Sequence, residues 1–580
     1  MILRKRTKLE AIGIALLFVC ISVGSVFGTI LKDPVGTTPG NGFVNPNYIW
    51  NSNGQTWTAT GPNIQASLNL SGTTYLPSKT LYINTSLLMR NNSCLIGQGW
   101  TTVIKAGAGL GTVPMIMNEA GYPPAHTNHD IEVRNLQLDG SDPTHSKSTG
   151  YNYGVLFAKV TWGTVDNVLV RDLGKDGVRA YNSNHISFSY ITGNNTGIHT
   201  AFLGYGTDNS SISHINAIYA LKEAVCVEWP NPTTGKRNEH ILISDVSCFL
   251  NEQHGLFIQD SNWVTVSNYI ADNTSAVGVY ISVNCSNIDI MNCQINSTAG
   301  TNGGDGFYVA ATGTNNIHFT NCIADDIVHS STGYTAFNLN GNNITLTNCQ
   351  GTRCGPPFKI GSTARNVTIA SSTFANYGVM ATIYGKDIRL TGNRFLYHSA
   401  TLTAIITVDA GAKRVSIIGN DFSNAAATTA KVIDSSDYAE ILNNLGFPTS
   451  FYFRKGGTIP MGYSGAYSTS LVLHPETQSI ASPIIWFRNT GKINASETVT
   501  LQFQANFYTG RTAYINKTIV GPYNSLTYWW NMTDSDWYLL YPDTMYKGGE
   551  QLQRLTLYAK TTNASSSSTA AIAAYLLILG

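Results

Sequence analysis

The sequence predicts an all-β protein, in which a right-handed parallel β-helix of about 12–14 coils precedes a C-terminal antiparallel β-sandwich. Three observations predict this fold. Only 12% of the 580 residues are charged, about half the usual share. A short strand-like phrase recurs through the middle of the chain, about once every 26 residues. No helical pattern separates these phrases, so successive strands must wind as coils around one core.

Charge and composition exclude two classes of protein. The 35 basic and 34 acidic residues leave a net charge of +1, which provides no long-range attraction for nucleic acid. Disorder is excluded as well, because 43% of the residues are hydrophobic and 11% are aromatic. The 54 glycines suit many short strands joined by tight turns.

The first 31 residues form a targeting segment. Arg4, Lys5, Arg6 and Lys8 precede an uncharged run over 11–31. This run is either a cleaved signal peptide or a single N-terminal membrane anchor, and both alternatives place the rest of the chain outside the cell, secreted or at the cell surface. Residues 32–54 then form a linker. The 14 N-x-S/T sequons permit glycosylation, although this Asn, Ser and Thr content produces about as many by chance.

The recurring phrase has two polar residues, then alternating apolar and polar residues, then usually Asn or Asp. Its period of two predicts a strand with one buried face. We place the coils within residues 55–447. The twelve copies begin at His129, Asp166, Asn184, Ser210, Glu239, Asn262, Ser286, Asn315, Asn342, Arg365, Lys386 and Lys413.

Asn or Asp at the seventh position predicts a corner with left-handed backbone, where stacked side chains form a hydrogen-bonded ladder. Eight copies have such a residue, and three consecutive copies place a cysteine directly after it. Three stacked thiols cannot all pair, so we expect a buried ladder of free thiols. The eight residues are Asn135, Asp172, Asn216, Asp245, Asn268, Asn292, Asn321 and Asn348, and the cysteines are Cys293, Cys322 and Cys349.

Two stretches resemble the pectate-lyase-like superfamily. The residues from Ser67, SLNLSGTTYLPSKTLYINTSLLMRNNSCLIGQGWTTVIKA, are similar to the coil that opens its solenoid, and NLQLDG from Asn135 is similar to one of its turns. The resemblance covers roughly residues 55–445 and implies a right-handed parallel β-helix. It implies little about activity, because the same solenoid occurs in polysaccharide lyases, glycoside hydrolases, epimerases, phage tailspikes and inert adhesins.

Residues 451–580 have separate strand-like runs and predict the β-sandwich. Neighbouring residues of a strand point to opposite faces, so Trp529 and Trp530 cannot both be buried on one face. One exposed tryptophan favours sugar binding or contact with a second subunit. We therefore expect a carbohydrate-binding role or homo-oligomer assembly for this domain.

Any site of a β-helix lies on an outer face, where outward side chains of successive coils line up. A second strand in each coil supplies two such rows if Val178, Ile198, Val225, Leu256, Val279 and Phe307 point inward. Polar and aromatic side chains in these rows suit a groove for a sugar chain. The expected substrate-binding residues are Arg179, His199, Glu228, Phe257, Gln259, Tyr280 and Tyr308.

The resemblance also implies catalytic candidates. DGVRAYN, EAVCVEW and HGLFIQD stand where polygalacturonase-like hydrolases have their conserved segments, which assigns acid/base roles to Asp176 and Glu223 and a supporting role to His254. Lys222 and Gln253 depart from that pattern. Two coils separate Asp176 from Glu223, about 10 Å, which is close to the carboxylate spacing of inverting glycosidases.

No cofactor is expected for a hydrolase. A lyase would bind Ca²⁺ through a cluster of acids, for which Asp139 and Asp142 are the candidates, although a turn explains them equally well. The sequence therefore favours an extracellular protein that acts on or binds a polysaccharide, as a glycoside hydrolase or polysaccharide lyase. The alternative is a non-catalytic surface, spike or adhesin-type protein whose solenoid is a spacer.

Overall fold

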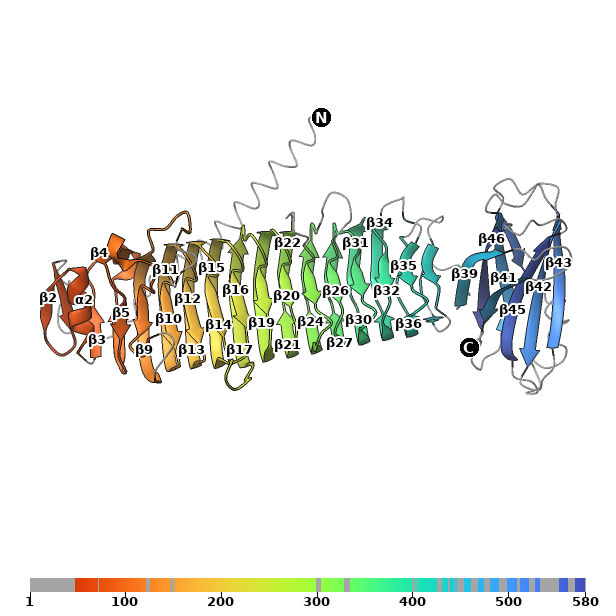
Figure 1. The fold of residues 1–580 in the computed structure, drawn as a ribbon. Helices are drawn as coiled ribbons and strands as arrows, with labels where there is room; N and C mark the ends of the chain where they lie inside the picture. The colour runs from red at the N-terminus through yellow and green to blue at the C-terminus, as the bar shows by residue number, and fades with distance from the viewer. Residues whose placement is uncertain are drawn as a thin grey trace, which may run out of the picture.

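The computed structural model shows an elongated stack of parallel β-coils (Figure 1). It describes residues 47–445, except 71, 122–125, 147–149, 151, 299–303, 328–333, 399–401, 403, 425–429, 437–438 and 443, and it describes eight strands between 453 and 578. The predicted targeting segment, 1–31, lies outside these residues. Within them, no helix is both long enough and apolar enough to cross a bilayer.

Each coil contributes one short strand to a parallel sheet of 14 strands, which confirms a right-handed β-helix of about 14 turns. These strands have three to five residues. In chain order they are β5 (Leu87–Met89), β8 (Ile116–Asn118), β10 (Val155–Ala158), β12 (Val178–Tyr181), β14 (Ala201–Gly204), β16 (Val225–Glu228), β18 (Leu256–Ile258), β20 (Val279–Ile281), β23 (Phe307–Val309), β26 (Phe337–Leu339), β29 (Phe358–Ile360), β32 (Ala381–Ile383), β35 (Ala404–Val408) and β37 (Ala430–Asp434).

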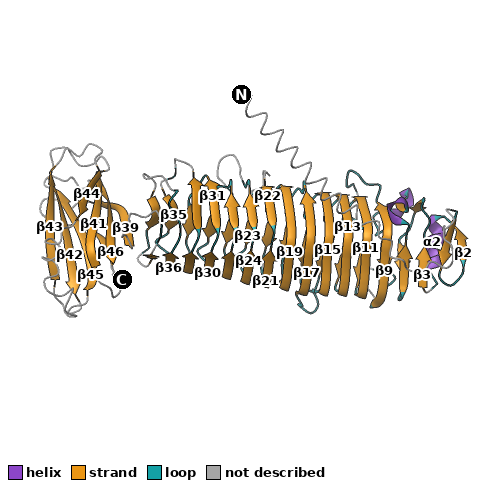
Figure 2. Ribbon diagram, turned by 180° about the vertical axis from the view of Figure 1, so that it is seen from behind, coloured by secondary structure: helices purple, strands orange, loops and turns teal. Residues whose placement is uncertain are grey.

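The rest of each coil belongs to a sheet of 24 strands, whose strands bend around the core (Figure 2). Six central coils contribute one long strand each, and later coils divide it in two. The long strands are β9 (Asn128–Asp139), β11 (Val160–Leu173), β13 (Asn184–Thr196), β15 (Asp208–Ala220), β17 (Asn238–Phe249) and β19 (Ser261–Thr274). The later strands are β21 (Ser286–Met291), β22 (Gln294–Thr298), β24 (Asn315–Thr320), β25 (Ile323–Asp325), β27 (Asn342–Thr347), β28 (Gln350–Thr352), β30 (Arg365–Ala370), β31 (Thr373–Tyr377), β33 (Lys386–Thr391), β34 (Arg394–His398), β36 (Lys413–Ile418) and β38 (Ala439–Leu442).

Left-handed residues bend the long strands once every five residues. In β13 these corners are His185, Tyr190 and Asn195, with φ of 55°, 52° and 59°. Because the corners repeat within a strand, the phrase can be matched at more than one starting position of the same coil. The copies predicted to begin at Asp166 and Ser210 are out of register, because Asn184 pairs with Thr161 and Asp208 in the neighbouring strands.

The predicted Asn ladder is present, and it follows two corner rows. At the predicted seventh position, Asn321 Nδ2 donates to Asn292 Oδ1 over 3.1 Å. At the second position of the phrase, Asn316 Nδ2 donates to Asn287 Oδ1 over 3.0 Å. Asn216 is not a corner, because it pairs with Thr192 inside the strands, and His214 takes the corner with φ 54°.

The core between the sheets is filled by Val, Ile, Leu and Phe from every coil. Phe307 and Phe337 stack with 5.0 Å between ring centroids. Cys293, Cys322 and Cys349 are buried and free, which confirms the predicted thiol ladder.

A short helix, α2 (Gly61–Leu68), covers the N-terminal end of the coils. Pro62 lies in its first turn, where no backbone N–H is needed, and Ile64 and Leu68 are buried against the core. Short strands pair with one another around this helix, and two 3₁₀ turns follow the last two of them. The strands are β1 (Tyr48–Asn51), β2 (Thr56–Thr58), β3 (Gly72–Tyr75), β4 (Thr80–Ile83), β6 (Ser93–Ile96) and β7 (Val103–Ala106), and the turns are η1 (Gly99–Thr101) and η2 (Ala108–Leu110).

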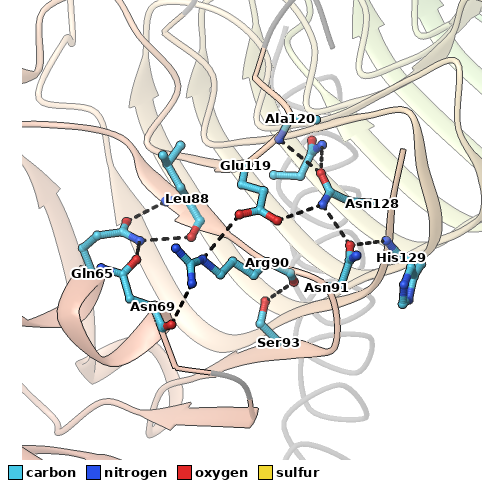
Figure 3. A network of polar contacts seen from close by, with 11 residues as sticks. Gln65, Asn69, Leu88, Arg90, Asn91, Ser93, Glu119, Ala120, Asn128 and His129 are labelled. Carbon is cyan, nitrogen blue, oxygen red and sulfur yellow. Dashed lines mark hydrogen bonds and ion pairs between the residues drawn. The ribbon is translucent and has the colours of Figure 1, made fainter. Parts of the chain in front are cut away.

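Polar side chains tie this cap to the first coils (Figure 3). Gln65 of α2 accepts from Leu88 N over 2.7 Å, and Arg90 donates to Asn69 O over 2.9 Å. Arg90 also lies 3.4 Å from Glu119. The cap therefore satisfies backbone groups that an open end of the solenoid would leave exposed.

Beyond the last coil, eight strands form two antiparallel sheets of four. Their packing as a β-sandwich stays a prediction, and so does the exposure of Trp529 or Trp530. The first sheet has the order β39 (Phe453–Pro460), β46 (Thr569–Ile578), β41 (Ile480–Asn489) and β44 (Thr527–Asn531). The second has the order β40 (Ser468–Leu473), β45 (Leu552–Thr561), β42 (Thr498–Phe507) and β43 (Thr512–Val520).

Candidate functional site

The register of the 14-stranded sheet decides which side chains share a row. Val178 pairs with Ala201, and Ala201 pairs with Val225. Ala201 therefore occupies this inward row, and the prediction that Ile198 does so is wrong. His199 does not share the row of Arg179, as predicted, but belongs to a row two residues before the inward one, here called the leading row. That leading row contains Asp176, His199, Glu223, His254, Val277 and Asp305.

Three residues of the leading row form a hydrogen-bonded chain across three coils. His199 Nδ1 lies 2.8 Å from Asp176 Oδ1, and His199 Nε2 lies 2.9 Å from Glu223 Oε2. The second oxygen of Asp176 accepts from Arg179 Nη1 over 2.7 Å. All four side chains are buried, and Asp176 is 0% exposed. One imidazole thus joins the two carboxylates that the sequence predicts as the acid/base pair.

The charged groups of this hydrogen-bonded chain stabilise one another in their ionised forms. Burial alone would raise the pKa of Asp176, but His199 and Arg179 outweigh it and lower the pKa to about 2. Burial would also disfavour a charged imidazole, yet Asp176 and Glu223 raise the pKa of His199 to about 9. The pKa of Glu223 is lowered, since His199 outweighs the burial of its carboxyl group. At neutral pH an imidazolium therefore lies between two carboxylates.

Arg179, a predicted substrate-binding residue, is enclosed by aromatic rings. Its guanidinium lies 3.8 Å from the ring centroid of Phe202 and 5.3 Å from that of Tyr153. Tyr205 and Trp229 complete the enclosure at 5.7 Å and 5.9 Å. The sequence analysis missed this aromatic group, which comes from turns and from the row shared with Arg179. Such cation–π contacts stabilise a buried guanidinium.

Glu228, at the end of β16, differs from the other acids. Burial is the largest influence on its carboxyl group and raises its pKa to about 7. A carboxyl oxygen of Glu228 lies within 4.8 Å of a nitrogen of His199 and of the Cys226 thiol. Glu223 and Glu228 are five positions apart in the sequence, but both approach the same imidazole. Their protonation states at neutral pH differ, because the pKa of Glu223 is lowered and that of Glu228 is raised.

An open hollow of about 440 Å³ begins one coil beyond Glu223. His254 marks its start, and its Nδ1 accepts from Val277 N over 3.2 Å, so the neutral ring carries its proton on Nε2. Burial lowers the pKa of His254, which favours that neutral form. The lining residues are Gln253, His254, Ala276, Val277, Tyr280, Asp305 and Tyr308.

Aromatic rings form one wall of this hollow. Tyr280 meets Tyr308 edge to face at 4.9 Å, and Phe257 meets Tyr280 in the same way at 5.2 Å. Asp305, which the sequence did not single out, also lines the hollow. Burial raises the pKa of its carboxyl group, although hydrogen bonds from Asn338 and Thr335 oppose the shift. The remaining predicted residue, Gln259, donates to Asp260 over 2.8 Å.

Two groups of the described residues have ligand atoms close enough for a metal ion, and both are already engaged. In the group Asp208, Glu239 and His240, Asp208 lies 2.9 Å from Lys236 and 3.1 Å from His240. In the group His199, Cys226 and Glu228, both nitrogens of His199 already contact carboxylates. The Ca²⁺ candidates are also engaged, because Asp139 lies 3.0 Å from Lys105 and Asp142 accepts from Ser146. These contacts fit the interpretation of Asp139 and Asp142 as turn residues.

Residues 153–329 match the family model described as the right-handed beta helix region. With the coils described above, this match confirms the predicted right-handed parallel β-helix. The matched residues include Asp176, Arg179, His199 and Glu223 and every residue that lines the hollow. No curated protein matches the chain.

Three solved structures illustrate the likeness in fold. The A-module of the mannuronan C-5 epimerase AlgE6 of Azotobacter vinelandii is 14% identical, with a TM-score of 0.33, over 66% of this chain and 94% of that one. The tailspike of Escherichia coli bacteriophage HK620, solved with a pentasaccharide, is 10% identical, with a TM-score of 0.39, over 95% and 100%. The family 28 exopolygalacturonase of Yersinia enterocolitica is 9% identical, with a TM-score of 0.39, over 69% and 82%. At such values the likeness carries no argument about activity.

Proposed function

We propose that the protein binds a polysaccharide in the hollow beside His254 and hydrolyses it with Glu228 and Glu223. The observation that carries this proposal is that two neighbouring carboxyl groups have pKa values shifted in opposite directions, one coil from an open aromatic hollow. Pairs of acids whose environments separate their pKa values are typical of general acid and general base roles.

The hollow suits a sugar chain. The faces and edges of Tyr280 and Tyr308 offer apolar surface to sugar rings. His254 Nε2–H and the Asp305 carboxyl group offer hydrogen bonds to hydroxyl groups. Binding along the sheet, a chain that fills the hollow would continue toward Glu223, because His254 and Glu223 are neighbours in the leading row.

The chemistry divides between the two glutamates. Glu228, with a pKa of about 7, donates a proton to the leaving oxygen, and ionised Glu223 activates water. Asp176 and Arg179 do not contact the sugar in this proposal, because Asp176 is 0% exposed and aromatic rings enclose Arg179. They position His199 as the cation between the carboxylates. The predicted catalytic role of Asp176 thus becomes a positioning role.

The test is incubation with a panel of neutral and acidic polysaccharides. Reducing ends report hydrolysis, and absorbance near 235 nm reports the unsaturated product of a lyase. The variants Glu228→Gln and Glu223→Gln should lose the reducing-end signal, whereas Glu440→Gln, an exposed acid on β38, should keep it. Product from Glu228→Gln at the wild-type rate would refute the assignment, and unsaturated product would replace hydrolysis by elimination.

The second candidate is a non-catalytic extracellular surface or spike protein. The complete mutual pairing of buried Asp176, Arg179 and His199 favours it, because a structural ion pair needs no substrate. In this proposal the C-terminal strands, packed as a sandwich, bind a glycan or join subunits into a homo-oligomer. An oligomer that dissociates when residues 451–580 are removed, together with no product from any polysaccharide, would support this function over hydrolysis.

Extracellular location is part of both proposals. It depends on the segment 1–31, whose run of 21 uncharged residues begins at Ala11. N-terminal sequencing of the protein from its native host distinguishes a cleaved signal peptide from a retained anchor. Recovery of uncleaved protein in the cytosol would contradict both alternatives.

A further inference from the structure

A second hollow, of about 510 Å³, lies on the outer face of the 24-stranded sheet and so on a different face from the first. Trp162 and His185 stack beside it with 3.9 Å between ring centroids and 23° between their planes. Hydroxyl groups of Thr164, Ser187 and Ser211 line its floor. The proposed hydrolysis gives no role to this combination of an aromatic ring and neutral hydrogen-bonding groups.

Trp162 occupies a position at which every coil needs left-handed backbone. Asn adopts this conformation easily, whereas a bulky ring does not. Asn fills the position in six coils, but Trp162 and Trp263 have φ of 64° and 56° there. In chain order this corner row is Asn92, Asp130, Trp162, His185, Asn209, His240, Trp263, Asn287, Asn316, Asn343, Asn366, Asp387 and Arg414.

The rings bring no compensating burial. Trp162 is 56% exposed and Trp263 is 54% exposed. They also replace side chains that would extend the ladder, as Asn316 does by donating to Asn287 over 3.0 Å. His185 Nδ1 is buried without a hydrogen-bond partner among the described residues. Strained backbone, exposed apolar rings and an unpaired nitrogen at one row indicate selection for contact with a ligand.

We propose that Trp162 and Trp263 are stacking platforms of a second saccharide-binding site, along the corner row of the 24-stranded sheet. The platforms are four coils apart, about 19 Å, and His185, Asn209 and His240 lie between them. A glycan running along the coil axis would stack on both indoles and bond to these side chains. The inference rests on the proposed function only for the class of ligand, since the two sites share no residue.

The charge of the hollow selects a neutral glycan. Asp130 and Glu132 line it, and none of the described lining residues is Lys or Arg. Arg134 lies 3.1 Å from Glu132, where it already has a carboxylate partner. A uronic-acid polymer would bring further negative charge to this surface, so a chain of uncharged hexoses fits better.

The experiment is affinity electrophoresis of the full chain in gels that contain a neutral glucan, a neutral mannan or polygalacturonate. The variant Trp162→Asn/Trp263→Asn removes both platforms and supplies the residue that the ladder uses, so we expect it to fold. The matched control Tyr280→Ala/Tyr308→Ala removes the aromatic wall of the first hollow. Circular dichroism checks that all proteins keep their β-rich spectrum.

We expect at least one neutral polymer to retard the wild-type protein, and the tryptophan variant to lose five-fold or more of that affinity while the tyrosine variant loses less. Retardation that is unchanged in the tryptophan variant overturns the second site and leaves the first intact. The absence of retardation by every neutral polymer overturns it too. A change in sedimentation of the tryptophan variant without glycan would assign the row to a protein contact instead.

Discussion

The carboxylates of Asp176 and Glu223 come from coils two turns apart and meet the same imidazole. His199 lies between them, 2.8 Å from the first and 2.9 Å from the second. The coil spacing alone separates their backbones by about 10 Å. The imidazole fills this interval, and it converts two acids that would repel each other into a linear chain of alternating charge.

The first prediction concerns the loss of this imidazole. His199→Asn leaves Arg179 as the one charged group among the described residues at hydrogen-bond distance from Asp176, and leaves Glu223 with no such cation among them. Removing one partner of a buried ion pair costs about 3–5 kcal/mol, so we expect a clearly lower midpoint of urea unfolding. His318→Asn, at an exposed position of β24, is the matched control and should leave the midpoint nearly unchanged. Equal midpoints for the two variants would contradict a stabilising role for the hydrogen-bonded chain of Asp176, His199 and Glu223.

The second prediction is a loss of stability at alkaline pH. The pKa of His199 is raised to about 9 in the folded protein, from about 6.5 in the unfolded chain. The stability that its charge contributes is complete below the unfolded value and disappears as the pH rises through 9. The Tm should therefore fall more between pH 7.5 and 10 in the wild-type protein than in His199→Asn.

Buried thiols, whose pKa values are also raised, destabilise both of these proteins equally above pH 9, so the difference between the two Tm profiles measures His199. Parallel profiles would show that His199 is not charged in the folded state. Below neutral pH the carboxylate of Asp176 has the opposite effect. Its contribution to the stability of the fold is complete above the unfolded-state pKa of 3.8 and is lost as the pH falls through the folded-state pKa of about 2.

The sequence predicts the solenoid well because its signals are local. Alternation marks each strand, and the ease with which Asn adopts left-handed backbone marks the corners, as at Asn292 and Asn321. The row of His199 could not be predicted in the same way. Thr196-Gly197-Ile198 imitates Asp176-Gly177-Val178, but the backbone pairs Val178 with Ala201, so one longer turn shifts the row by three residues.

The relation between the acids was beyond sequence reasoning for a different reason. Glu223 and Glu228 are five residues apart, and distance along a strand separates them by about 17 Å. Only the directions of their side chains bring both toward His199. The raised pKa of Glu228 likewise depends on burial in the folded protein, which no local pattern encodes.

The third prediction is the pH profile of the proposed hydrolysis. Glu228 acts as an acid only while protonated, and its pKa is about 7. The kcat/KM should therefore fall as the pH rises through 7, and Glu228→Gln should lose both the activity and this descending limb. A leaving group that needs no protonation, such as an activated aryl glycoside, should restore part of the activity of that variant. Activity that stays level to pH 9 would assign the acid role elsewhere.

The fourth prediction concerns the thiol ladder. Cys293, Cys322 and Cys349 are buried, and the thiols of Cys322 and Cys349 have pKa values raised by their neighbours in the ladder and by burial. Thiols held neutral react slowly with alkylating agents. Iodoacetamide at pH 8 should leave all three unmodified in the folded protein and modify all three in guanidinium chloride, as peptide mass mapping measures. Rapid modification in the folded protein would contradict a closed core.

The last prediction separates the two contributions of the Asn ladder at Asn343. This residue has φ of 50°, donates to Asn315 over 2.6 Å and accepts from Asn366 over 2.7 Å. Asn343→Ala loses both bonds and keeps a β-carbon in left-handed backbone without the short polar side chain that lets asparagine tolerate it. Asn343→Gly loses the same bonds but also removes the β-carbon, so glycine adopts this conformation freely. We expect Asn343→Ala to be less stable than Asn343→Gly by about 1 kcal/mol in urea unfolding. A glycine variant less stable than the alanine variant would show that the corner imposes no backbone strain, and that the ladder is held by its hydrogen bonds alone.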